Sequence, residues 1–144
     1  MENWQTKALE YFPELRETIE DQLGRGIGIM GLWIELHTSL LAAYDAEPVD
    51  DEQIGRIYRY AAWCFSQPQI GTADTDPSSA AAVGLIEDLP LTQRVADDLY
   101  RWMSLESFEG CENLFRYHLD DEQYQKFAAD FKRKKNSFTG ISII

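Results

Sequence analysis

The two histidines, His37 and His118, are the first residues of this chain to test for acid–base or metal chemistry. Imidazole acts as a base or a ligand near neutral pH. A carboxylate-bridged di-iron site in a helical bundle needs Glu-x-x-His motifs. Ile34 and Phe115 stand three residues before the two histidines, so the spacing excludes that site. The sequence predicts no metal and no cofactor.

The two cysteines, Cys64 and Cys111, are far apart in the sequence. Zinc sites need Cys and His at close spacings, and neither cysteine has such a neighbour. We expect both to be reduced thiols of a cytosolic protein, with a disulfide left open by the sequence. A nucleophilic pair of Cys64 with His37 also stays open, whereas Cys111 and His118 lie about two turns apart on one predicted helix, too far for direct contact.

A glycine-rich segment, Gly24-Arg25-Gly26-Ile27-Gly28, is the remaining candidate for chemistry, as a phosphate-binding loop. It lacks the lysine and the preceding strand that such a loop requires. The segment is therefore predicted to break the chain between two helices. Without an assembled catalytic motif, we expect that the protein is not an enzyme.

The histidines receive structural interpretations instead. His37 lies on the apolar face of a predicted helix, between Trp33 and Leu41, and we expect it to be buried and hydrogen-bonded within the core. The apolar stripe of that helix is predicted to consist of Met30, Trp33, Ile34, Leu40, Leu41 and Tyr44. His118 ends a later predicted helix, where an imidazolium suits the negative end of the helix dipole.

Charge gives the clearest indication about partners. The chain has 25 acidic and 13 basic residues, a net charge of −12. Nucleic acid and anionic membranes repel such a surface, so we expect neither as a partner. Five acids crowd one short segment and are predicted to bind a basic protein partner, the alternative being a solvated surface. They are Asp45, Glu47, Asp50, Asp51 and Glu52.

Helical punctuation recurs along the chain and predicts an all-α fold. About seven short helices are expected. Their predicted ranges are 4–23 with a step at Pro13, 29–43, 51–66, 77–89, 93–103, 105–118 and 121–135. Residues 1–135 are expected to form a single domain and residues 136–144 a C-terminal tail. The basic run at residues 132–135 is expected to complement the end of the last helix.

Two helix starts and one close contact are also predicted. Asp50 is expected to cap the helix at 51–66, and Asp120 with Gln123 to form a capping box before the last helix. The small residues at 80–82 and 84 are expected to let a neighbouring helix approach closely.

Two arrangements of these helices stay open, an irregular bundle and a short HEAT-like stack. The tetrapeptide at residues 57–60 (IYRY) resembles the one at residues 99–102 (LYRW). Their offset falls within the period of about 40–47 residues that HEAT and armadillo repeats have. The N-terminus has no basic segment followed by an apolar run, so we expect no signal peptide and a cytoplasmic protein.

Several short motifs carry a resemblance to a family. They are FPEL at residues 12–15, AAWCF at 61–65, the alanine-rich residues 80–83, residues 87–90, and Phe108. Over about residues 8–131 the chain resembles a family of small, uncharacterised bacterial all-helical proteins. The resemblance implies a helical fold and no known activity. Small acidic proteins of this kind are also similar to immunity proteins of toxin systems.

Two functions follow as hypotheses. The first is a non-enzymatic protein-interaction domain, of the immunity type, whose acidic surface covers a basic partner. The second is a small-molecule-binding or enzymatic domain with a pocket between helices, formed by Trp33, His37 and Glu87. A deep polar cavity around His37 would favour the second, and a solid core with an acidic groove the first.

Overall fold

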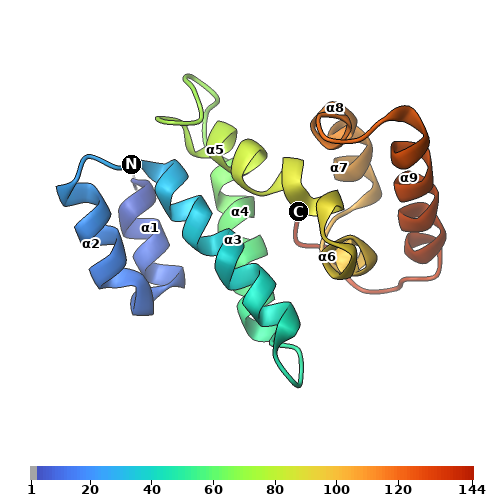
Figure 1. The fold of residues 1–144 in the computed structure, drawn as a ribbon, viewed down its shortest axis with the longest axis horizontal. Helices are drawn as coiled ribbons and strands as arrows, with labels where there is room; N and C mark the ends of the chain where they lie inside the picture. The colour runs from blue at the N-terminus through green and yellow to red at the C-terminus, as the bar shows by residue number, and fades with distance from the viewer. Residues whose placement is uncertain (1–2) are drawn as a thin grey trace.

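The computed structural model describes residues 3–144, and helices dominate this part of the chain (Figure 1). In it, 72% of the residues are helical and no strand is present, which confirms the all-α prediction. The elements are α1 (Trp4–Tyr11), η1 (Pro13–Leu15), α2 (Arg16–Gly24), α3 (Ile29–Asp45), α4 (Asp51–Phe65), α5 (Pro77–Gly84), η2 (Ile86–Leu91), α6 (Gln93–Asp98), η3 (Leu99–Arg101), α7 (Leu105–Gly110), α8 (Glu112–Arg116) and α9 (Asp121–Asn136), where η marks a 3-10 turn.

The predicted helix starts are largely confirmed. The step at Pro13 separates α1 from α2, since proline lacks the N–H that would continue the first helix. Asp50 caps α4 by accepting a hydrogen bond from the N–H of Gln53, at 3.1 Å. At the start of α9, Asp120 and Gln123 form the expected capping box.

Three predicted helices are shorter than expected. The helix from Pro77 ends at Gly84 and continues as the 3-10 turn η2, which contains Pro90. The segment after Thr92 divides into α6 and η3, and the Thr92 side chain makes no capping hydrogen bond. The segment after Ser104 divides into α7 and α8 at Cys111. Tertiary packing decides these breaks, which the periodicity of the sequence does not mark.

The two resembling tetrapeptides adopt different structures. Residues 57–60 lie inside the continuous, 15-residue helix α4. Residues 99–102 form the 3-residue turn η3 and its cap, after a helix α6 of only 6 residues. The paired helices that a HEAT-like repeat requires are not reproduced, so the fold is better described as an irregular bundle.

The helices follow one another along the long axis of the molecule, with α3 and α4 crossing near the middle and α9 at one end (Figure 1). Trp33 of α3 and Tyr60 of α4 are both buried, with ring centroids 5.7 Å apart, and Phe12 lies against Tyr60 at 5.8 Å. Towards the other end, the rings of Phe108 and Phe131 stack at 3.9 Å. No helix within residues 3–144 is long and apolar enough to cross a membrane.

The loop between α4 and α5 is organised by one buried carboxylate, Asp76. Its oxygens accept hydrogen bonds from the N–H groups of Ile70 at 2.9 Å and Ser78 at 3.0 Å, and more weakly from that of Gly71 at 3.3 Å. Burial alone would raise the pKa of Asp76, but these donors and the Ser79 hydroxyl together lower it below its usual value. The ionised carboxylate of Asp76 therefore stabilises the conformation of this loop.

The C-terminal tail lies along the domain. The N–H groups of Ile143 and Ile144 donate to the Trp102 carbonyl at 2.9 and 3.0 Å, and the Ser104 N–H donates to the Ile144 carbonyl at 2.8 Å. The ring of Phe138 packs edge-on against Tyr100 at 5.4 Å. The predicted tail is thus joined to η3 and to the start of α7 by hydrogen bonds and aromatic contacts.

Candidate functional site

A cleft of about 450 Å³ opens between α3, α5, η2 and the residues that follow α8, and we call it the His37 cleft. Helix α3 contributes Met30, Trp33, Ile34, His37 and Thr38; the other elements contribute Val83, Gly84, Glu87, Asp88, Tyr117 and His118. All three residues of the predicted pocket, Trp33, His37 and Glu87, line this one cleft.

The close approach of α5 to α3 forms the floor of the cleft. A Cβ atom on Gly84 would lie 2.5 Å from the Cβ atom of Trp33 and 2.8 Å from its Cγ atom. Only glycine allows this contact, because real side chains do not approach so closely. The small residues predicted to let a neighbouring helix come near thus have that effect here.

The rim of the cleft exposes large apolar side chains. Ile34 is 65% exposed, Tyr117 73% and Val83 39%. The sequence pattern placed Ile34 on the core stripe of its helix; this prediction is wrong, because the stripe that faces the core is formed by neighbours such as Trp33 and Leu36. Apolar groups of this size gathered around a hollow are typical of binding surfaces.

Two adjacent carboxylates, Glu87 and Asp88, lie on one wall of the cleft. The side chain of Glu87 is only 14% exposed, and His118 lies beside both acids, its Nε2 atom 3.9 Å from Glu87 Oε1 and 3.4 Å from Asp88 Oδ1. Burial raises the pKa of Glu87; the nearby His118 opposes this shift and the Asp88 carboxylate adds to it. Among residues 3–144, no lysine or arginine lines the cleft.

His37 differs from its prediction. The side chain is half-buried at the edge of the cleft, and its buried Nδ1 atom has no hydrogen-bond partner. The expected hydrogen bond within the core is therefore wrong. No group on the protein fixes the ring through this nitrogen, which leaves an unpaired polar atom beside the cleft.

The chemistry of the other titratable groups is limited. No three His, Cys, Asp or Glu side chains within residues 3–144 lie close enough to hold a metal ion. Both cysteines are free thiols. Burial raises the pKa of Cys64 to about 12, and it also raises the pKa of Cys111. A thiol with so high a pKa is a poor nucleophile, which weighs against the Cys–His pair that the sequence left open.

Most of the linker acids have partners inside the protein. Asp45 pairs with Arg94 at 3.1 Å, Asp51 with Arg101 at 2.9 Å, and Glu52 with Arg56 at 3.7 Å. Asp50 caps α4, and Glu47 alone among the five makes no such contact within the described residues. These contacts give four of the five acids a structural role; the sequence predicted the cap formed by Asp50 but not the three ion pairs.

The basic run at the end of α9 also joins elements of the fold. Lys134 pairs with Asp130 at 2.9 Å and donates to the Asp97 carbonyl at 3.0 Å, and Lys135 donates to the Tyr100 carbonyl at 2.9 Å. The run therefore holds the last helix against α6 and η3, as well as lying at the negative end of α9.

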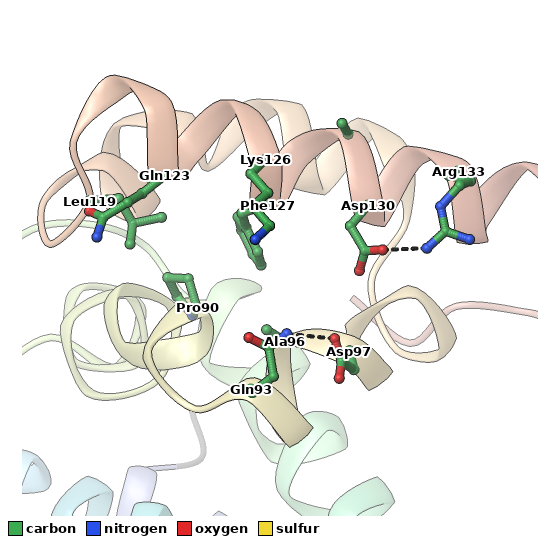
Figure 2. Close-up of a pocket in the computed structure, with 11 residues that line it drawn as sticks. Pro90, Gln93, Ala96, Asp97, Leu119, Gln123, Lys126, Phe127, Asp130 and Arg133 are labelled. Atoms are coloured by element: carbon green, nitrogen blue, oxygen red, sulfur yellow. Dashed lines mark hydrogen bonds and ion pairs between the residues drawn. The ribbon is translucent and has the colours of Figure 1, made fainter.

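A second groove, of about 640 Å³, runs between α9 and the η2–α6 segment. Figure 2 shows Phe127 pointing into this groove. Both acids that line the groove have partners: Asp97 accepts a hydrogen bond from Gln93 at 2.7 Å, and Asp130 pairs with Arg133 at 2.5 Å. Because its carboxylates are already paired, this groove is a less suitable binding site for a basic partner than the His37 cleft is.

The sequence missed part of the site and found part of it. Trp33, His37 and Glu87 were named from their residue types, but nothing marked Asp88 and His118 as neighbours. They are separated by α6, η3, α7 and α8, and only the packing of α8 on η2 brings them together. Tyr117 carried no signal, because an aromatic residue at the end of a helical pattern is normally taken as core.

Comparison of the chain with protein-family models, with curated proteins and with solved structures finds no match in any of the three. The resemblance to small bacterial helical proteins stays a prediction. The function must therefore be inferred from the geometry described above.

Proposed function

We propose that the chain is a non-enzymatic protein-interaction domain and that it binds its partner through the face around the His37 cleft. The observation that carries the proposal is the exposure of Ile34, Val83 and Tyr117 around a hollow. Exposed aromatic and aliphatic side chains beside a pocket are the usual anchors of protein interfaces. Other exposed apolar side chains, such as Ile70 and Ile141, do not line the cleft.

The partner is proposed to be basic. The chain carries a net charge of −12, and the part of the chain that the structure describes gives the cleft two carboxylates and no lysine or arginine. Complementary charge speeds association and excludes acidic competitors, including nucleic acid. An immunity-type role in the cytoplasm, with a basic toxin as partner, is one interaction of this kind. The linker acids, Glu47 above all, would then add to the attraction from outside the contact face.

Site-specific photo-crosslinking tests this proposal. A photo-reactive amino acid in place of Ile34 or Tyr117 should crosslink the same protein in cells of the source organism. The control position is Ile141, which is exposed in the tail and does not line the cleft. With that protein purified, Ile34→Asp should weaken its binding at least about tenfold, as loss of an interface anchor does. Equal crosslinking from all three positions would reject the cleft face.

A small-molecule-binding domain is the second candidate, and a specific observation favours it. Trp33, His37 and Glu87 line one cleft of about 450 Å³, within the range of about 300–1,000 Å³ that ligand pockets have. The unpaired Nδ1 atom of His37 would find a partner if a ligand reordered the ring. A molecule retained by the purified protein, and lost from both His37→Leu and Glu87→Gln variants, would favour this candidate over protein binding.

A further inference from the structure

We propose that the His37 cleft receives the guanidinium group of an arginine side chain of the partner, with Glu87 and Asp88 as its acceptors. This inference rests on the proposed function and names the chemical group that the cleft recognises. It follows from the wall of the cleft, where two adjacent carboxylates have His118 as their one basic neighbour among the described residues.

The two carboxylates give the cleft wall several hydrogen-bond acceptors. The oxygens of Glu87 and Asp88 accept, and the Thr38 hydroxyl already donates its proton to the Ile34 carbonyl at 3.2 Å, so its lone pairs remain. A ligand that fits must therefore bring several donors. Guanidinium has five N–H donors in one plane, whereas an ammonium group is a compact point charge.

The apolar part of the cleft fits the same occupant. Tyr117 is 73% exposed, so its ring is accessible to a planar cation. Arginine stacks on aromatic rings and packs its methylene stem on apolar surface. Ile34 and Val83 offer that surface on the opposite side of the rim.

The burial of Glu87 makes the binding sensitive to pH. Burial raises the pKa of this carboxyl group, and its protonation removes one of the two charges that attract the guanidinium. The titratable groups that face Glu87 in the cleft are His37 from α3, the neighbouring Asp88, and Tyr117 and His118 after α8. Affinity should therefore fall on acidification.

Titration with a defined pair of peptides tests the inference. The probes are acetyl-Leu-Arg-Leu-amide and its citrulline counterpart, which keeps the shape of arginine and lacks the charge. Amide chemical shifts of the ¹⁵N-labelled protein should move at residues 34, 87, 88 and 117, with the arginine peptide binding at least about tenfold more tightly, the ratio that one charged hydrogen bond supplies. Equal affinity of the two peptides would overturn the inference.

Two variants locate the effect. Glu87→Gln combined with Asp88→Asn should lower the affinity for the arginine peptide to that for the citrulline peptide. Asp97→Asn, in the groove between α6 and α9, should leave the affinity unchanged. Wild-type affinity should fall as the pH is lowered through the raised pKa of Glu87, and Glu87→Gln should reduce that fall. Retained discrimination in the double variant, or shifts at residues 45–52 instead, would contradict the assignment.

The failures of the two proposals can be told apart. If Ile34→Asp weakens the complex with the purified partner but the Glu87 and Asp88 double variant does not, the face binds protein without an arginine in the cleft. If neither change affects the complex, the proposed function itself is wrong.

Discussion

The carboxylate of Asp98 is predicted to stabilise the fold more than any exposed ion pair does. It accepts hydrogen bonds from the Tyr44 hydroxyl at 2.7 Å, the Trp102 indole N–H at 2.9 Å, and the Arg101 guanidinium at 2.5 and 2.8 Å. Burial raises the pKa of Tyr44, with Tyr58 and Asp98 adding to the shift, so the hydroxyl keeps its proton and donates. Arg101 continues the network to Asp51 of α4.

Replacing Asp98 by alanine should lower the free energy of unfolding by about 3 kcal/mol. The change leaves Tyr44 and Trp102 without their acceptor, at about 1–3 kcal/mol for each donor left buried. Arg101 keeps its pair with Asp51, and the Asp98 side chain is 19% exposed, so the loss stays at the lower end of the range for broken buried pairs, about 3–5 kcal/mol.

Asp97→Ala is the matched control, because it makes the same substitution one position earlier on the same helix. Asp97 is 49% exposed, and its loss should change stability by less than about 1 kcal/mol. Urea unfolding followed by circular dichroism gives both values by linear extrapolation. If Asp98→Ala destabilises the protein no more than Asp97→Ala does, the network does not hold α3, α4 and η3 together as described.

Two further predictions concern the backbone around the site. The folded-state pKa of Asp76 lies below its usual value, so its stabilisation is present above about pH 4, the ordinary carboxyl pKa, and is lost as pH falls through the folded value. Between about pH 7 and about pH 3, the free energy of unfolding should therefore fall less for Asp76→Asn than for the wild type. Urea unfolding at both pH values measures this, and an equal fall for the two proteins would contradict the role of Asp76. Gly84→Ala should cost about 1–3 kcal/mol through its clash with Trp33, whereas Gly110→Ala, with nothing within 4 Å, should cost none. Similar melting temperatures for the two glycine variants would show that the α3–α5 contact is not tight.

Local signals predicted the parts of the fold that depend on local chemistry. Pro13, Asp50 and the Asp120 capping box mark their boundaries because proline and capping side chains act on neighbouring residues. The break at Cys111 has no such signal, since it depends on how α7 and α8 pack on the rest of the chain. Helix existence was therefore predictable, and the length of the later helices was not.

The candidate site, too, could be predicted from the sequence only in part. Residue types pointed to His37 and Glu87, but the spacing of Ile34 placed it wrongly in the core, because a stripe wider than one face leaves the outermost residue exposed. The sequence also gave no indication of the ion pairs that the linker acids form within the protein. Arg94 and Arg101 approach Asp45 and Asp51 only after α6 and η3 fold against the end of α3 and the start of α4. Contacts between distant segments have no signature in a single sequence.

The affinity of the purified partner for two variants tests the central claim most directly. Ile34→Asp changes the rim of the His37 cleft, and Glu47→Lys reverses the one linker acid that makes neither an ion pair nor a capping hydrogen bond within residues 3–144. Isothermal titration at physiological salt should give a Kd raised at least about tenfold by Ile34→Asp, and changed only slightly by Glu47→Lys, since exposed charges are screened beyond about 8 Å. A large loss with Glu47→Lys and none with Ile34→Asp would place the binding surface at the linker and contradict the account.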